Sequence, residues 1–457
     1  MRSSKAQVEA RVHALPALRF EEQQLTSYSG AVVLQALFER LALKKRLARC
    51  FKPLLGAAYA TQAIVLLLVV HLMVGCRQLR DRDYYADDPL IKRVVGLRQI
   101  PDVATITRRL ANTEEEELGR VHDLNRSVVL ERLTMEGFRR VTLDFDGSVI
   151  TTRGHAEGSA VGYNRKHKGA RSYYPLFCTV AQTGQIFDHL HRSGNVHDSN
   201  GARDFMRACF DQVRSSLPDV RLEARMDSAF FSEELVYGLA AGRVEFTVSL
   251  PFERFPELKE LIESRKTWHR IDDTWSYADL QWKPKRWRGA FRVLAIRRRT
   301  RRQSKEPLQL DLFVPKDFDY EYKVILTNKA ADSAPDVLHY HNGRGSQEGI
   351  LGEAKSCTQL DYIPMRRLAG NRLFTLASVM AHNLGRELQI VAIERSSSDT
   401  IKRAARWSFA KLSTLRQRIL LRPGRITRPE GKLTLTLSGN ERVRDDVNHL
   451  LDAQRAA

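Results

Sequence analysis

The chain has 457 residues, of which 43% are hydrophobic, so it is long enough for two to four domains with ordinary buried cores. Lysine and arginine outnumber aspartate and glutamate by 74 to 54, and the resulting formal charge of +20 indicates a polyanionic partner, with nucleic acid as the first choice. The five cysteines form no close pair and no metal-ligand spacing, which argues against a disulfide framework and indicates reduced thiols in the cytoplasm.

Residues 1–130 show the pattern of an all-helical domain. The first thirty residues contain no continuous apolar segment behind a basic start, so we expect no secretory signal. The apolar run at 63–74 is shorter than the roughly 20 residues that a membrane span needs, which favours a buried core helix. Two short helical stretches follow between residues 87 and 110, and the second is polar and basic. This is compatible with a helix-turn-helix reader or with a structural helix pair.

Apolar and polar side chains alternate along residues 139–147, which predicts a strand. At a period of two, Asp144 and Asp146 lie on the same face of that strand. Asp146-Gly147 is also a common start of a turn. Alternatively, two carboxylates at the end of a buried strand hold a hard divalent cation, because such ions require oxygen ligands.

Further strands are predicted over residues 172–181, 185–192 and 220–227, with helices over 199–215 and from about residue 231. Three successive strands followed by alternating helix and strand is the order of an RNase H-like fold, an α/β fold with a mixed sheet covered on both faces. The first and fourth strands are neighbours in that fold. Asp146 should therefore lie near Asp227, which ends the strand at 220–227.

The 120 residues between Asp227 and Glu348 are too many for a simple connection. Their composition predicts a β-rich insertion domain over 243–335, with strands at 244–250, 289–297, 308–314 and 321–326. This segment holds four of the five tryptophans and the basic run 297–302. Indole rings stack on bases and guanidinium groups neutralise phosphates. The candidate DNA contacts are Trp287, Arg298, Arg299 and Arg301, although the tryptophans could instead form a small core and the arginines a solvated loop.

A helix is predicted from about residue 345. At about 100° per residue, Arg344, Glu348 and Lys355 lie within about 40° of one another, whereas Glu353 points to the opposite side. Glu348 is therefore the better catalytic candidate. Arginine and glutamate four residues apart also pair on many surface helices, so a solvated salt-bridge stripe is the alternative.

Taken together, three stretches resemble a known family. They are Asp146-Gly147-Ser148, Met226-Asp227-Ser228 and the set Tyr340, Arg344, Glu348 and Lys355. They resemble the DDE transposases of bacterial insertion sequences, in the branch with a Tyr-Arg-Glu-Lys signature, and most closely the insertion sequence 1380 group. The likeness extends over most of the chain. One departure is that three residues separate Tyr340 from Arg344, where the branch usually has two, so that His341 stands at the expected place.

This resemblance implies an enzyme that binds the ends of a mobile element, cleaves phosphodiester bonds and joins the 3′ ends to target DNA. Asp146, Asp227 and Glu348 would hold two Mg²⁺ ions, replaceable by Mn²⁺, with Asp144 as a reserve ligand. Tyr340, Arg344 and Lys355 would grip phosphates near the cut. Residues 1–130 would help to bind double-stranded element ends, and a homodimer on DNA is expected because two ends must meet. A cytoplasmic protein without a membrane span follows.

The catalytic domain is accordingly predicted in two parts, at residues 131–242 and 336–392, around the insertion. A helix over 368–386 should pack against the sheet and complete the fold. Residues 393–457 form a basic C-terminal region with a strand-like stretch at 433–437, which could contact DNA or another subunit. Two other functions remain open: a non-catalytic DNA-binding regulator derived from a mobile element, and an RNase H-like nuclease that only degrades.

Overall fold

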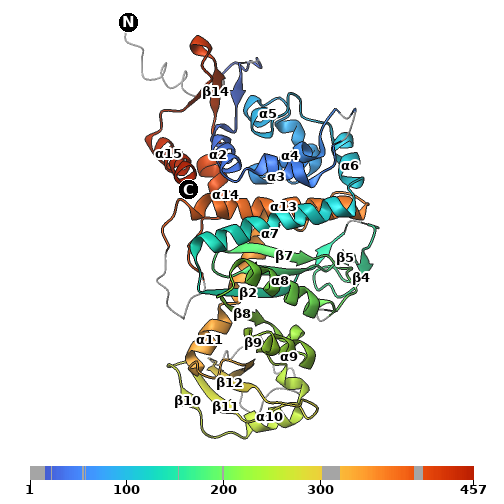
Figure 1. The fold of residues 1–457 in the computed structure, drawn as a ribbon, viewed down its shortest axis with the longest axis vertical. Coiled ribbons are helices and arrows are strands. Elements are labelled where there is room, and N and C mark those ends of the chain that lie inside the picture. Colours follow the sequence, from blue (N-terminus) through green and yellow to red (C-terminus); the bar gives the residue numbers. More distant parts are fainter. Residues whose placement is uncertain are drawn as a thin grey trace, which may run out of the picture.

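The computed structural model describes residues 16–21, 23–53, 56, 58–152, 154–197, 200–300, 320–395 and 405–457. The molecule is elongated, with a helical region at one end, two long helices across the middle, and an extended sheet that reaches the other end (Figure 1). Arg301 and the strand predicted at 308–314 lie outside the described residues.

The sheet has nine strands in the order β10-β11-β12-β13-β9-β8-β2-β6-β7. Its central strands are β2 (Arg140–Gly147), β6 (Leu176–Val180), β7 (Gln185–Leu190), β8 (Arg221–Met226) and β9 (Glu245–Ser249). β2, β8 and β9 run parallel, whereas β6 pairs antiparallel with both β2 and β7. The predicted adjacency of the first and fourth strands is confirmed, and this order fits an RNase H-like fold.

Helices cover both faces of the central strands, which explains why β2 is buried from Val141 to Phe145. On one face, α8 (Ala202–Ser216) packs against β2, with the rings of Phe210 and Phe145 5.7 Å apart. On the other, Phe177 and Ile186 pack with α12 (Gly345–Cys357) and α13 (Leu368–Ile390). Asn383 of α13 accepts from the backbone N–H of Ile186 at 2.8 Å, so the prediction that this helix packs on the sheet is confirmed.

Of the strands predicted for the insertion, those at 244–250, 289–297 and 321–326 are present as β9, β12 and β13, and they continue the same sheet. β13 (Tyr320–Thr327) pairs antiparallel with β9, followed by β12 (Arg292–Arg299), β11 (Trp275–Leu280) and β10 (His269–Arg270). α9 (Glu233–Ala241), α10 (Pro256–Glu263) and α11 (Ala334–Asn342) accompany this half of the sheet (Figure 1). A boundary at residue 243 therefore falls just before β9, a parallel partner of β8.

The helical region consists of α2 (Val32–Arg40), α3 (Leu43–Cys50), α4 (Thr61–Val74), α5 (Pro89–Val95), α6 (Val103–Ala111) and α7 (Glu115–Glu136). Its core also includes residues of α13 and of α15 (Glu441–Ala456), so these helices share one apolar cluster with the end of the chain. α4 has 14 residues, of which 12 are buried, which confirms a core helix at this position. Among the described residues, no helix has both the length and the apolar character that crossing a membrane requires.

Short elements complete the fold. β1 (Leu25–Thr26), β14 (Gly424–Thr427) and β15 (Thr434–Leu437) form one small sheet, and β15 confirms the strand predicted at 433–437. A second small sheet, β3 (Ile150–Thr151), β4 (Ala160–Val161) and β5 (Arg171–Tyr173), lies between β2 and β6 in the sequence. The four-residue helix α14 (Leu412–Leu415) follows residue 405.

A buried ion pair joins β2 to β8. The Arg225 guanidinium donates to both oxygens of Asp144, at 2.6 and 2.7 Å, and Asp144 is fully buried. The same guanidinium donates to the backbone carbonyl of Tyr340 on α11 at 3.0 Å. Two strands and one helix therefore meet at a single side chain.

We predict that Arg225→Met lowers the free energy of unfolding by about 3–5 kcal/mol, because it leaves the Asp144 carboxylate buried without a partner. The double variant Asp144→Leu/Arg225→Met should be less destabilised than Arg225→Met alone, since it removes both charges. Urea unfolding followed by tryptophan fluorescence measures both variants. A double variant as unstable as the single one would contradict this account.

Candidate active site

Two acids lie at the ends of adjacent parallel strands. The last residue pair in the β2–β8 register is Asp144 with Arg225, two positions before Asp146 and Asp227. Because both strands run in the same direction, the two acids lie at the same end of the paired strands. Both side chains are half-buried, and Asp227 Oδ1 accepts from the backbone N–H of Ala229 at 2.9 Å. The fold thus brings together acids that are far apart in the sequence.

Glu348 and Asp146 both contact the same arginine, Arg344. Arg344 Nη2 is 3.5 Å from Glu348 Oε1, and Arg344 Nη1 is 3.8 Å from Asp146 Oδ2. The N-terminal turn of α12 is tied to β2 by buried Gln347, whose Nε2 donates to the carbonyl of Asp144 at 2.9 Å. The positive guanidinium is therefore in contact with both carboxylates.

The helical periodicity around Glu348 is confirmed. Glu353 is turned away, because its Oε2 accepts from Arg386 on α13 at 2.7 Å and its Oε1 accepts from the N–H of Leu412 at 3.0 Å. Glu348 is instead 66% exposed. Of the two acids on this helix, only Glu348 is available beside Asp146.

The three carboxylates supply the hard oxygen donors that Mg²⁺ prefers. Arg344 between Asp146 and Glu348 shows that this position attracts positive charge. Among the described residues, however, the ligand atoms of the three acids do not all lie within 4.8 Å of one another. A cation placed between Asp146 and Glu348 would have to displace Arg344.

Asp144 does not share this environment, which argues against its predicted role as a reserve metal ligand. Both of its oxygens accept from Arg225, and its exposed fraction is zero. Burial raises the pKa of Asp144, and the neighbouring guanidinium opposes that shift. The alternation correctly predicted the shared face of Asp144 and Asp146, but Asp144 lies one pleat too deep to reach the open edge.

Tyr340 also lies in the interior, which opposes the predicted grip on phosphate. It is 7% exposed, and its ring is 4.7 Å from Lys329 Nζ and 5.3 Å from the Arg225 guanidinium. Burial raises the pKa of the Tyr340 phenol well above its usual value. His341 is likewise buried, and its ring nitrogens contact Thr247 Oγ1 at 2.9 Å and Ser249 Oγ at 3.0 Å. Both residues stabilise the junction of α11 with the sheet.

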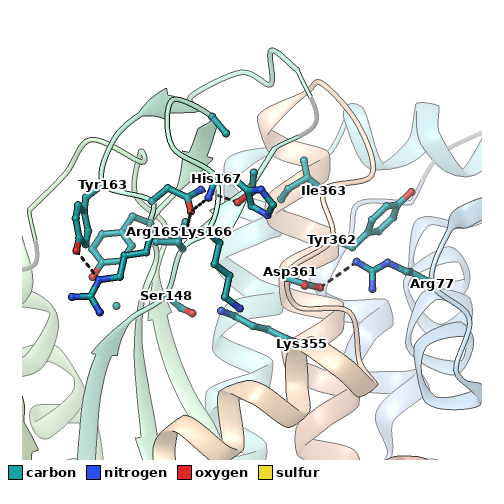
Figure 2. A pocket seen from close by; sticks show the side chains of 16 residues that line it. Arg77, Ser148, Tyr163, Arg165, Lys166, His167, Lys355, Asp361, Tyr362 and Ile363 are labelled. Atoms are coloured by element: carbon teal, nitrogen blue, oxygen red, sulfur yellow. Dashed lines mark hydrogen bonds and ion pairs between the residues drawn. The ribbon is translucent and has the colours of Figure 1, made fainter. Parts of the chain in front are cut away.

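A basic cavity of about 790 Å³ lies directly after Asp146, since Gly147 and Ser148 form part of its wall. Its cationic side chains come from distant segments: Arg77, Arg165, Lys166 and Lys355. Figure 2 shows the ends of Lys166 and Lys355 pointing into the same part of the cavity, beside Ser148. Burial lowers the pKa of Lys355, and the charge of Lys166 lowers it further. An anion in this cavity would relieve that repulsion.

The loop that carries Lys166 has a defined conformation. Asn164 Oδ1 accepts from the backbone N–H groups of Lys166 and His167, at 3.2 and 3.1 Å. Its Nδ2 donates to Thr151 Oγ1 at 3.0 Å, which anchors the loop to β3. Lys166, Arg165 and Arg77 were not among the predicted site residues. The basic run 165–168 was a signal for two of them, whereas nothing in the sequence relates Arg77 to Asp146.

Of the predicted DNA contacts in the insertion, some lie in its core and others on its surface. Trp287 is 7% exposed and stacks on Phe231, with ring centroids 5.1 Å apart and an interplanar angle of 18°. This position opposes a role in base stacking and supports the alternative that the tryptophans form a core. Arg298 and Arg299 are exposed at the end of β12, with Arg298 5.6 Å from the ring centre of Trp275.

The strand order, the acids at the strand ends and the basic cavity beside them define an α/β protein with a mixed sheet and an acidic site. Comparison with family models gives a match over residues 14–456 to the transposase DDE domain, group 1. The chain therefore belongs to the DDE transposase family. No curated protein matches it.

Solved structures with some likeness include the piggyBac transposase in a synaptic complex with hairpin DNA. It shares 12% identity at a TM-score of 0.42, over 94% of this chain and 81% of that one. The Mos1 transposase in a paired-end complex with the left transposon end shares 10% identity at a TM-score of 0.18, over 43% of this chain and 61% of that one. At these scores the family assignment rests on the family match alone.

We predict that Trp287→Ala lowers the free energy of unfolding by about 3–5 kcal/mol, because it removes a buried aromatic side chain and leaves a cavity. Binding of the folded variant to duplex DNA should equal that of the wild type. Denaturant unfolding and fluorescence anisotropy on labelled duplex measure the two effects. A stable variant with weakened DNA binding would instead place this indole on the DNA.

Proposed function

We propose that this protein is an active DNA transposase that binds the ends of a mobile element, cleaves phosphodiester bonds there and joins the freed 3′ ends to target DNA. The observation that carries this proposal is the meeting of Asp146, at the end of β2, with Glu348 through Arg344, beside Asp227 on the neighbouring strand. A protein that only bound DNA would need the basic cavity but not acids gathered at one edge of the sheet.

Asp146, Asp227 and Glu348 are the residues that would hold two Mg²⁺ ions, with Mn²⁺ as a substitute. Bound there, such ions activate the attacking oxygen and stabilise the leaving oxygen of the phosphodiester. The three carboxylates would keep the site negative enough to retain them. Arg344, once displaced from Asp146 and Glu348, becomes free to contact a phosphate of the bound strand.

The basic cavity is where the DNA strand next to the scissile bond would lie. Lys355 and Lys166 face the same space immediately beyond Ser148, two residues after Asp146. Phosphate groups would neutralise the two ammonium groups and release counterions. Arg298 and Arg299, exposed on β12, would extend the contact along the duplex. Because two ends must be joined to one target, we propose a homodimer on DNA.

We predict that Glu348→Gln abolishes strand cleavage, because the amide keeps the shape of the side chain but removes a charged metal ligand. The assay is cleavage and strand transfer of a plasmid that carries both element ends, with Mg²⁺. Glu353→Gln is the matched control on the same helix, and once its folding is verified it should retain the chemistry. Cleavage that persists in Glu348→Gln would rule out a metal-binding role, and cleavage without joining in the wild type would indicate a nuclease.

We predict that Lys166→Ala and Lys355→Ala each reduce the slope of log affinity against log salt by about 1, since each removes roughly one phosphate contact. Binding to a labelled mixed-sequence duplex at several salt concentrations gives these slopes. The pair Arg298→Ala/Arg299→Ala tests the insertion in the same assay. If the cavity variants keep the wild-type slope, the cavity lies off the path of the DNA.

A further inference from the structure

A second cluster of ligand-type side chains lies away from the strand-end acids, where α7 meets the edge strand β7. It consists of His122 on α7 and of Asp188 and His189 on β7. Each offers one ligand atom, and these atoms all lie within 4.8 Å of one another. Among the described residues, this is the group of three that reaches such spacing.

Asp188 is held in place from two sides. Its Oδ1 pairs with Nε2 of His122 and accepts from the backbone N–H of His189 at 2.7 Å. Its Oδ2 accepts from Nη1 of Arg126, one turn further along α7, at 3.0 Å. The carboxylate is therefore oriented by the arginine through one oxygen, while the other oxygen is directed at the histidines.

His189 is the member of this cluster that ordinary hydrogen bonding does not explain. It is 6% exposed, and its Nδ1 has no hydrogen-bond partner among the described residues. Its ring stacks on Phe177 with centroids 5.7 Å apart and lies 5.0 Å from the ring of His122. A buried polar atom without a partner is costly unless something binds it.

We propose that His122, Asp188 and His189 bind a Zn²⁺ ion that links α7 to the edge of the sheet. Two imidazole nitrogens and one carboxylate oxygen, with water in the fourth position, are the donor set that zinc accepts in an open tetrahedral site. The side chain of His122 is 25% exposed, so the cluster can be reached from solvent. The all-oxygen set at the strand ends suits Mg²⁺ instead, so the two sites differ in ion preference.

The simpler account is an ion pair of His122 and Arg126 with Asp188 and no metal. It satisfies both oxygens of Asp188. It leaves the buried Nδ1 of His189 without a partner and gives no reason for a second imidazole beside the first. A bound cation accounts for the convergence of all three side chains, and Arg126 then serves as the outer partner that orients the carboxylate ligand.

The test uses the full chain, dialysed against buffered free Zn²⁺ and then analysed for metal content by mass spectrometry. We expect one tightly bound zinc per chain, and a Co²⁺-loaded sample with the visible absorption of a tetrahedral nitrogen and oxygen site. His122→Ala should weaken zinc binding by more than the roughly 10–100-fold that loss of an outer partner costs. His122→Asn is a second variant of this partly exposed position, and circular dichroism verifies that both fold.

Two matched controls separate this site from its surroundings. His191→Gln alters a half-buried histidine that follows β7 and lies outside the cluster, and it should keep the zinc. Asp146→Asn alters the strand-end acids and should also keep it. Wild-type protein without zinc, zinc retained in both His122 variants, or zinc lost in Asp146→Asn would each overturn the proposal. None of these outcomes bears on the proposed transposase chemistry, which depends on other residues.

Discussion

The buried pairing of Asp144 with Arg225 is the interaction on which the geometry of the acidic site depends. The two residues are 81 positions apart in the sequence but directly opposite each other on adjacent parallel strands. At a period of two, the residues one pleat further on are Asp146 and Asp227. The ion pair therefore fixes the strand register just below the site, and a slip of one residue would send one of the acids to the other face.

The same pair also holds the third acid in place. Arg225 donates to the carbonyl of Tyr340 on α11, and the carbonyl of Asp144 accepts from Gln347 at the start of α12. Glu348 is the next residue along that helix. The two partners of one salt bridge thus contact the three segments that carry the acids. Breaking it would disturb the site even though neither partner is exposed to solvent.

Local patterns explain what the sequence could predict. The alternation around Leu143 and Leu222 identified β2 and β8, and helical periodicity correctly separated Glu348 from Glu353, because both patterns depend only on neighbouring residues. Whether Asp144 or Asp146 reaches the edge could not be decided in this way. Both acids lie on the same face of β2. They differ because Arg225, on a strand that is distant in the sequence, pairs with Asp144. The continuation of β9 into the insertion depends in the same manner on non-local pairing.

Residue type alone could not decide the role of Trp287. An indole has enough apolar area to stabilise a small core or to stack on a base, and only its position in the fold decides between them. The cavity was missed for the converse reason. Arg77 and Lys355 are ordinary residues of separate helical segments, and Lys166 belongs to a loop shaped by Asn164. These side chains line one cavity only when the helical region, α12 and the small sheet are assembled.

Several positive side chains around the site repel one another. Arg344 contacts the carboxylates of Asp146 and Glu348, and it helps burial to lower the pKa of Lys323 to about 8. Lys355 is disfavoured as a cation by burial and by Lys166. In the proposed function, cations between the acids would neutralise carboxylates that repel phosphates, and a polyanion in the cavity would neutralise the charges of Lys166 and Lys355 that repel cations. Metal and nucleic acid would then bind to this site more tightly together than separately.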